Sequence, residues 1–284
     1  MAKAPGAPLV WPEAAAGWGA RLTFGYITPL LRLGATGGRT LSPDDLYAVS
    51  PVESAVELRA RFRAAGEGAD AFATFKARAW RLVRPTMLPA AGCQLIASGG
   101  QVVQPLLLRA LVAACAMDDA AAARAAALRL AGATAACVLL TALAQQHQTH
   151  LALRSGQRLR AAVIAEVYGA TLAGRGERDD ARGGAATNPT NLVANDAQKL
   201  FEVTLNANLL WAAPLTVVVV SALLLHLVGA HALAGIATLC AVLPVARRVV
   251  KSMMQLRARR MPVADERVRV LSEVLAGLAA RRRG

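Results

Sequence analysis

The sequence predicts an all-α membrane protein, a polytopic helical bundle with long helical extensions on the cytosolic side. Of its 284 residues, 55% are hydrophobic and only 18% are charged, and the mean hydropathy is +0.40. This balance excludes a disordered chain and most classes of water-soluble domain. Three stretches contain no Asp, Glu, Lys or Arg and are each long enough to cross a bilayer: 85–108, 130–153 and 203–246.

The third charge-free stretch, of 44 residues, is too long for one span. At 1.5 Å per residue it would be ~66 Å long, about twice the ~30 Å hydrocarbon core. Gly229, Ala230 and His231 form a polar break near its middle. An alanine-rich soluble bundle is the alternative, but LLWAAPLTVVVVSALLLHLVG is apolar on every side of a helix. We therefore predict four spans, at about 85–112, 130–153, 203–228 and 231–250.

The distribution of charge predicts the orientation. The chain has 32 Lys and Arg against 18 Asp and Glu, a net charge of +14. Residues 1–84 hold 11 basic and 7 acidic residues, 154–202 hold 7 and 6, and 247–284 hold 11 and 3. By the positive-inside rule these three regions face the cytosol, and the lack of a recognisable signal peptide agrees for the N-terminus. We expect the basic flanks to attract membrane lipid rather than nucleic acid.

The segment before the first span, within 1–84, contains an apolar stripe. The string RLTFGYITPLLRLGA places Phe24, Ile27 and Leu30 at helical spacing, with Leu31 beside them. Arginines flank the stripe. This pattern predicts a helix lying in the membrane interface, with an ordinary packed helix as the alternative.

The connection between the second and third spans is long and partly helical. Residues 151–172 contain strong helix formers and no proline, so the second span is expected to continue well past the membrane surface. Glycine, charge and proline then break the helix over 174–189. A short amphipathic helix follows at about 190–200, with Leu192, Val193 and Leu200 among polar residues.

The tail repeats this design. A basic helix leaves the fourth span, Pro262 interrupts it, and a second amphipathic helix follows at about 262–277. Both patterns predict that the chain reverses direction far from the bilayer. A reversal there presents the motion of the membrane spans to a cytosolic partner.

Six strings, in order over residues 21–278, resemble the first transmembrane domain of ATP-binding cassette exporters of subfamily C, the multidrug-resistance-associated type. They are FGYITPLLRLGATGGRTLSPDDLYAVSP, QPLLLRALV, GQRLRAAVIAEVYGATL, NLVANDAQKLFEVTLNANLLWAAPL, LAGIATLCAVLPV and DERVRVLSEVLAGL. Two departures stand out: Asn188-Pro189 replaces a common Gly-Glu pair, and the sequence after Gly277 lacks the family's hydrophobic-Lys continuation.

The resemblance implies a partial transmembrane domain in 85–284, corresponding to the first four helices of an ABC type-1 exporter, preceded by a lasso-like segment in 1–84. Such exporters are alternating-access pumps for amphipathic organic anions. ATP and Mg²⁺ belong to nucleotide-binding domains, which we expect as partners together with further transmembrane helices. The implied coupling residues are Asn191, Leu192, Val193 and Asp196 in the first segment and Asp265, Glu266, Arg267 and Glu273 in the second.

The second predicted span ends in a run of polar residues, 145–150. Intramembrane polar residues usually face a bundle interior, so these residues line a substrate path or, alternatively, already lie at the cytosolic surface. His147 and His150 lack a third metal ligand, so we expect no metal site. Trp211 suits either the path or an interfacial anchor. The candidate path residues are Gln145, His147, Gln148, Asn206 and Trp211.

No residue pattern predicts catalysis by this chain. Nucleophile-base pairs and paired carboxylates are absent, and Glu166 stands alone on its helix. Residues 98–101 spell Ser-Gly-Gly-Gln, much of the signature of cassette ATPases, but lie in a charge-free stretch without any phosphate-binding loop in the chain. The small residues at 97–100 are better explained by close helix packing.

Two alternatives to an exporter part remain open. One is a stand-alone membrane protein that binds or regulates a complete transporter, and the other is a non-functional fragment. We predict a multi-pass integral membrane protein whose N-terminus is cytosolic, in either the plasma membrane or the vacuolar membrane.

Overall fold

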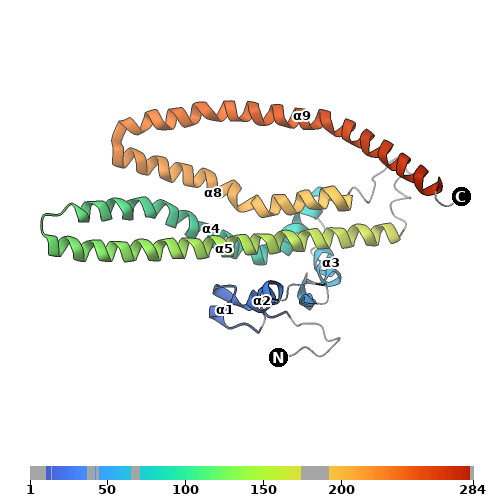
Figure 1. The fold of residues 1–284 in the computed structure, drawn as a ribbon, viewed down its shortest axis with the longest axis horizontal. Coiled ribbons are helices and arrows are strands. Elements are labelled where there is room, and N and C mark those ends of the chain that lie inside the picture. Colours follow the sequence, from blue (N-terminus) through green and yellow to red (C-terminus); the bar gives the residue numbers. More distant parts are fainter. Residues whose placement is uncertain are drawn as a thin grey trace. The chain divides into compact units, whose positions relative to one another are not determined.

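The computed structural model describes residues 11–13, 15–36, 42, 45–64, 71–173 and 192–281, with side chains up to residue 256 except those of Ala71, Leu192 and Ala194. Helices make up the regular elements of this described part (Figure 1), which confirms the predicted all-α class. In chain order they are α1 (Trp18–Leu22), η1 (Gly25–Ile27), α2 (Thr28–Thr36), η3 (Pro51–Glu53), α3 (Ala55–Arg63), α4 (Ala71–Cys115), α5 (Ala120–Leu172), η4 (Leu192–Asp196), α8 (Ala197–Val228), η5 (Gly229–His231) and α9 (Ala232–Arg281).

Three helical stretches are long and apolar enough to cross a membrane: Phe72–Cys115, Ala120–Leu172 and Ala197–Leu256. The last contains the predicted break, because α8 ends at Val228 and the η5 turn separates it from α9. Gly229 opens this turn with φ of 74°, a left-handed conformation that glycine adopts without steric cost. The long apolar stretch therefore consists of two helices, α8 and α9.

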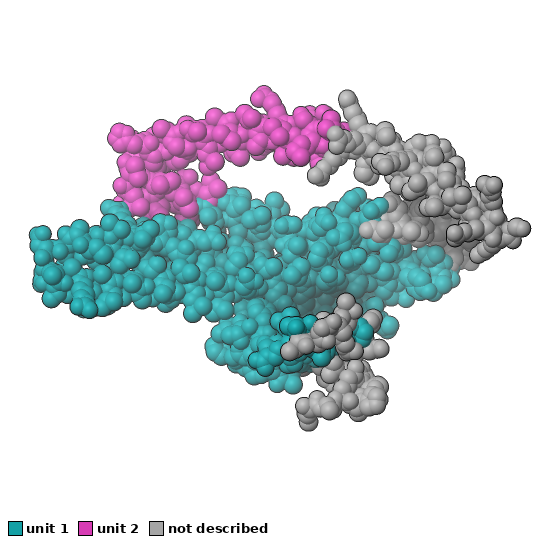
Figure 2. All heavy atoms as spheres, in the orientation of Figure 1, with its two compact units in different colours: residues 1–216 teal, residues 217–284 magenta. Residues whose placement is uncertain are grey.

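The chain divides into two compact units, residues 1–216 and 217–284, with the boundary inside α8 (Figure 2). In the first unit, α4 and α5 lie side by side as a helical hairpin (Figure 1). Asp119 caps the start of α5, because its carboxylate accepts hydrogen bonds from the amides of Ala121 and Ala122 at 2.9 and 3.3 Å. The predicted extension of the second apolar helix is present, since α5 continues without interruption to Leu172.

Small residues bring α4 and α5 together. Ala97 is fully buried, and a Cβ added to Gly100 would lie 2.0 Å from the Thr141 Oγ1 atom and 3.1 Å from its Cβ. The Cys137 thiol also reaches the Gly100 carbonyl oxygen at 3.8 Å. The sequence expectation that residues 97–100 serve close packing is thus confirmed at Ala97 and Gly100.

Gly100→Ala is expected to lower the free energy of unfolding by about 1–2 kcal/mol, because the overpacking outweighs the higher helix propensity of alanine. The matched control is Gly99→Ala, since a Cβ at Gly99 meets nothing within 4 Å. Thermal melting of the detergent-solubilised chain measures both. Equal melting temperatures for the two variants would contradict close packing at Gly100.

Two sequence expectations about helix continuity are wrong. The apolar stripe before the first span is interrupted, because Phe24 takes a positive φ of 56° between α1 and η1. In the tail, α9 runs as one helix through Pro262, so the predicted interruption there is absent. Pro262 removes one intrahelical hydrogen bond and crowds the preceding turn, but strong helix formers on both sides, Arg259 to Met261 before it and Ala264, Glu266 and Arg267 after it, offset this cost. The predicted break at 174–189 lies outside the described residues.

Candidate functional site

An apolar cluster joins four helices at the end of α5 that the sequence places outside the membrane. Phe62 of α3 and Phe75 of α4 meet edge to face, with ring centroids 5.9 Å apart. Ala197, the first residue of α8, is completely buried in the cluster. The start of α8 is therefore fixed to the outer part of α5. The buried members are Leu58, Phe62, Leu82, Val83, Leu159, Ala162, Val163 and Ala197.

The first predicted coupling segment immediately precedes this anchor. Residues 192–196 form the π-helical turn η4, in which Val193 is half-buried and Asp196 is exposed. The Asp196 carboxylate pairs with the Lys199 ammonium at 3.2 Å on the same helical face. Asn191 and the Leu192 side chain lie outside the described part. The segment thus exposes polar side chains directly before Ala197, which is buried in the apolar cluster.

Sequence reasoning did not identify a close approach between α5 and α8 at Gly156. A Cβ added to Gly156 would lie 2.7 Å from the Phe201 ring and 3.2 Å from the Phe201 carbonyl oxygen. Ser155, beside it, is fully buried, and its hydroxyl lies 2.6 Å from that of Thr86 on α4. Neither Gly156 nor Ser155 carries a signal in a single sequence, because both look like ordinary helix positions.

An ion-pair network ties the N-terminal segment to α5. The Glu53 carboxylate accepts hydrogen bonds from Arg154 Nε and Arg158 Nε, each at 2.8 Å, and Arg154 also donates to Glu13 at 3.0 Å. Burial alone would raise the pKa of Glu53, but the hydrogen bonds and charges of Arg158 and Arg154 outweigh it and lower this pKa. The charged form of Glu53 is therefore part of the folded arrangement.

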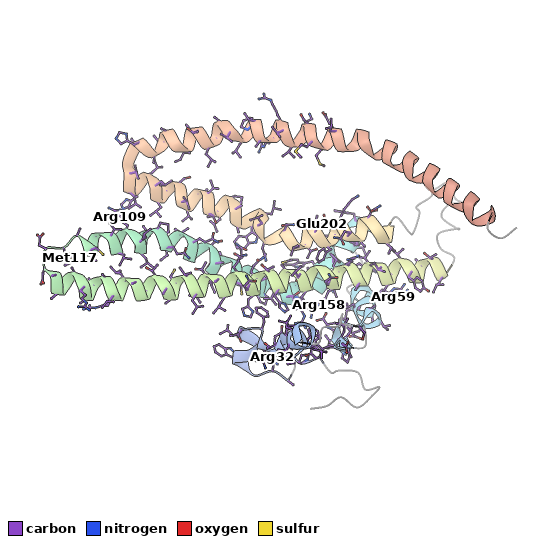
Figure 3. The ribbon with its side chains drawn as sticks, in the orientation of Figure 1. Arg32, Arg59, Arg109, Met117, Arg158 and Glu202 are labelled. Atoms are coloured by element: carbon purple, nitrogen blue, oxygen red, sulfur yellow. The ribbon has the colours of Figure 1, made fainter. Side chains whose placement is uncertain are left out.

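A second network corrects the sequence reading of Glu166 as an isolated acid. Its carboxylate accepts hydrogen bonds from Arg59 at 3.0 Å and from Arg63 at 2.7 Å, both on α3. Figure 3 labels Arg59 on α3 and Arg158 on α5. The partners are more than 100 residues apart in sequence, so no local pattern predicts the pairs. Together the two networks hold the segment before the first span against the outer part of α5.

The candidate path residues of α5 divide into two groups. The Gln145 amide donates to the Gln148 side-chain oxygen at 3.2 Å, and Gln148 is buried. His147 instead stacks on Phe24, with ring centroids 4.8 Å apart, and its Nε2 atom lies 3.0 Å from the Leu22 carbonyl oxygen. The structure therefore brings Gln145 and Gln148 together and directs His147 toward the N-terminal segment.

The candidate path residues of α8 form bonds within their own helix. The exposed Asn206 amide donates to the Glu202 carbonyl oxygen at 2.9 Å, and the Trp211 indole donates to Asn208 Oδ1 at 3.4 Å. Asn208 is 2% exposed, and its Nδ2 atom has no hydrogen-bond partner in the described part. Because a buried polar atom without a partner is costly, Asn208 is a candidate for contacting a polar ligand, together with Asn206 and Trp211.

The second coupling segment lies on the uninterrupted helix α9. Asp265, Glu266, Arg267 and Glu273 all belong to this helix, and their side chains are outside the described part. Among the described residues, no group of three His, Cys, Asp or Glu side chains is placed to hold a metal ion.

Most of the chain is similar to curated proteins. The profile of the ABC transporter transmembrane region matches residues 88–280. ATP-binding cassette sub-family C member 4 of Mus musculus is 28% identical over 269 residues, covering 91% of this chain and 20% of the relative. Its Homo sapiens namesake is 28% identical over 268 residues, with the same coverage. Sub-family C member 3 of Mus musculus is 26% identical over 299 residues, covering 94% and 19%. The chain thus spans about a fifth of the length of these relatives.

Proposed function

Because the chain belongs to the family of ABC transporter transmembrane regions, we propose that it supplies membrane-spanning helices and a coupling segment to an ATP-driven exporter of amphipathic organic anions. It is an integral membrane protein with three helical stretches able to cross a bilayer. In the proposal, nucleotide-binding domains bind ATP and Mg²⁺ and perform the hydrolysis. The residues described above convert that event into movement of the helices.

The family match carries the proposal, and the anchored turn supports the mechanism. A coupling segment transmits force only if its base is fixed to the helix that must move. The buried Ala197 and the close contact of Gly156 with Phe201 provide such a base directly after η4. The exposed Asp196 and Lys199 leave the tip available to a partner. We place this end of α5 and the N-terminus on the cytosolic side, where ATP is found.

The substrate path is assigned to the polar residues of α5 and α8. Gln145, Gln148 and Asn208 offer amide groups, and Trp211 offers a partly exposed aromatic face. Such a combination suits an amphipathic ligand, because amides orient its polar end while the indole contacts its apolar part. The organic-anion class itself follows from the resemblance to subfamily C.

Leu192→Asp is expected to uncouple ATP hydrolysis from transport. The apolar side chain of Leu192 enters a groove on the nucleotide-binding domain, and a carboxylate there is strongly disfavoured. The test uses a chimera in which these 284 residues replace the matching part of sub-family C member 4. ATP-dependent uptake of a fluorescent organic anion into inside-out vesicles should fall at least about tenfold, with ATPase activity retained.

The matched control is Asn195→Asp, which adds the same charge to the exposed side of the same turn. Surface abundance of both chimeras is measured by labelling. Normal transport by Leu192→Asp at normal abundance would reject the coupling role.

A further inference from the structure

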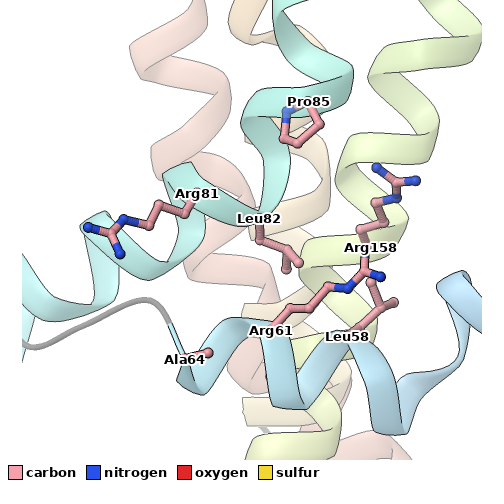
Figure 4. Close-up of a pocket in the computed structure, with 7 residues that line it drawn as sticks. All are labelled: Leu58, Arg61, Ala64, Arg81, Leu82, Pro85 and Arg158. Carbon is pink, nitrogen blue, oxygen red and sulfur yellow. The ribbon is translucent and has the colours of Figure 1, made fainter.

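A pocket of about 430 Å³ lies between α3, α4 and α5 (Figure 4). This volume lies within the range of ~300–1,000 Å³ that small-molecule sites occupy. The lining combines the apolar side chains of Leu58, Leu82 and Pro85 with the guanidinium groups of Arg61, Arg81 and Arg158. No carboxylate is among the described lining residues. The composition favours a ligand that is anionic at one end and apolar at the other.

The three arginines differ in how strongly they are already engaged. Arg158 is the most buried, with its side chain 13% exposed, and Glu53 holds it in position. Among the described residues, Arg61 pairs only with Glu57 on its own helix, and both side chains are nearly half exposed, so this pair is weak and exchangeable. Arg81 makes no ion pair with any described residue. Arg61 and Arg81 therefore keep donors available for an incoming anion.

Figure 4 shows how the charges are arranged. Arg61 reaches from α3 toward Arg158 on α5, whereas Arg81 extends away from them on the other side of Leu82. The apolar wall of Leu82 and Pro85 thus lies between two basic sites, one inside the pocket and one at its rim. An anionic group bound by Arg61 and Arg158 would have its apolar part beside Leu82.

The position of the pocket relative to the first membrane span indicates which ligand it binds. Arg81 and Arg84 are the last charges before the first charge-free stretch, which begins at Pro85. The residues of α4 that line the pocket therefore lie at the expected depth of the membrane interface. Beyond it, the exposed Leu88 continues the apolar face of α4. Basic pockets at this level bind lipid phosphates.

We propose that this pocket binds an anionic glycerophospholipid, whose phosphate is held by Arg61 and Arg158 with Arg81 at the rim and whose chains follow Leu82 and Pro85 into the bilayer. Guanidinium groups suit this ligand because they donate paired hydrogen bonds to phosphate oxygens. The site goes beyond the transport role and is independent of it. Its test measures lipid binding alone.

The experiment uses the purified 284-residue chain in a neutral detergent. Short-chain phosphatidic acid, phosphatidylcholine of the same chain length, or inorganic phosphate is added, and binding is measured by the rise in melting temperature and by native mass spectrometry. Phosphatidic acid should raise the melting temperature in a saturable way, because it binds the folded state. The Arg61→Gln and Arg81→Gln double variant should bind it at least about tenfold more weakly.

Arg109→Gln is the matched control, because it removes one charge from the opposite end of α4 (Figure 3). It should change the affinity by less than about twofold. Equal binding of phosphatidylcholine, equal stabilisation by inorganic phosphate, or an equal loss in Arg109→Gln would each overturn the lipid site. If the double variant melts lower without lipid, single Arg81→Gln replaces it, since Arg81 is exposed and forms no described ion pair.

Discussion

Glu53→Gln should release the N-terminal segment from α5 and lower the stability of that contact by about 2–4 kcal/mol. Glu53 is the shared acceptor of Arg154 and Arg158, whose side chains are only 29% and 13% exposed. In this variant both guanidinium groups stay partly buried but lose the negative charge of Glu53 as their counter-ion. Breaking a fully buried pair costs about 3–5 kcal/mol, and partial exposure reduces that value.

The measurement is limited proteolysis within residues 1–64, combined with thermal melting of the chain in detergent. Glu57→Gln is the matched control, because within the described part of the chain Glu57 pairs only with the exposed Arg61 on the same helix. Such a pair contributes about 0.5 kcal/mol or less. Equal protection of the N-terminal segment in both variants would show that the Glu53 network does not hold it.

The same network predicts a dependence on pH. The pKa of Glu53 is lower in the folded protein than its ordinary value, because Arg158 and Arg154 outweigh the effect of burial. Its contribution is therefore complete above the unfolded pKa of about 4.3 and is lost as the pH falls through the lower folded pKa. The stability difference between wild type and Glu53→Gln should stay constant from about pH 7 to 5 and shrink below about pH 4. A difference that persists undiminished at about pH 2 contradicts this assignment.

Gly156→Leu should separate α8 from α5 and cost at least about 1–3 kcal/mol. A Cβ at this position would lie 3.2 Å from the Phe201 carbonyl oxygen, and this backbone atom cannot move without moving α8. A leucine adds three further carbons in the same direction. Ala197 and Phe201 both belong to the start of α8. The displacement would therefore also move Ala197, which directly follows η4, out of the apolar cluster.

The control is Gly132→Leu on the same helix, where an added Cβ meets nothing within 4 Å. Melting temperature reports the loss of stability, and a cysteine crosslink between positions 162 and 197, which are both buried in the apolar cluster, reports the position of α8. Gly132→Leu should preserve both. Wild-type melting and crosslinking in Gly156→Leu would show that the helices are not in contact at this site.

The sequence predicts well the features that depend on local composition. The long α5 follows from helix formers without proline, and the turn at Gly229 follows from a polar break in an apolar stretch that exceeds the bilayer. Motif order predicts the family. Local composition does not predict the backbone at Phe24 or Pro262. The positive φ of Phe24 interrupts a regularly spaced apolar stripe, and Pro262 does not end the helix in which it lies.

The candidate site is less predictable because its contacts join distant parts of the chain. Glu166 has no partner within its own helix, yet Arg59 and Arg63 pair with it across more than 100 residues. Gly156 and Ala197 have no chemical signal at all, since their importance is the absence of side-chain volume. Spacing along one helix identifies which face is apolar, but it does not identify which residue of another helix meets that face.

The unbroken length of α5 turns small rotations into large displacements. Its 53 residues extend for ~80 Å, and the part beyond residue 153 accounts for ~28 Å of this length. A rigid rod pivoting by ~10° at that point carries its tip sideways by ~5 Å, close to the pitch of one helical turn. Amplification is thus a consequence of helix continuity: a modest tilt among the spans becomes a turn-sized step at the far end of α5, and the first turn of α8, which packs nearer the pivot, moves at most about half as far.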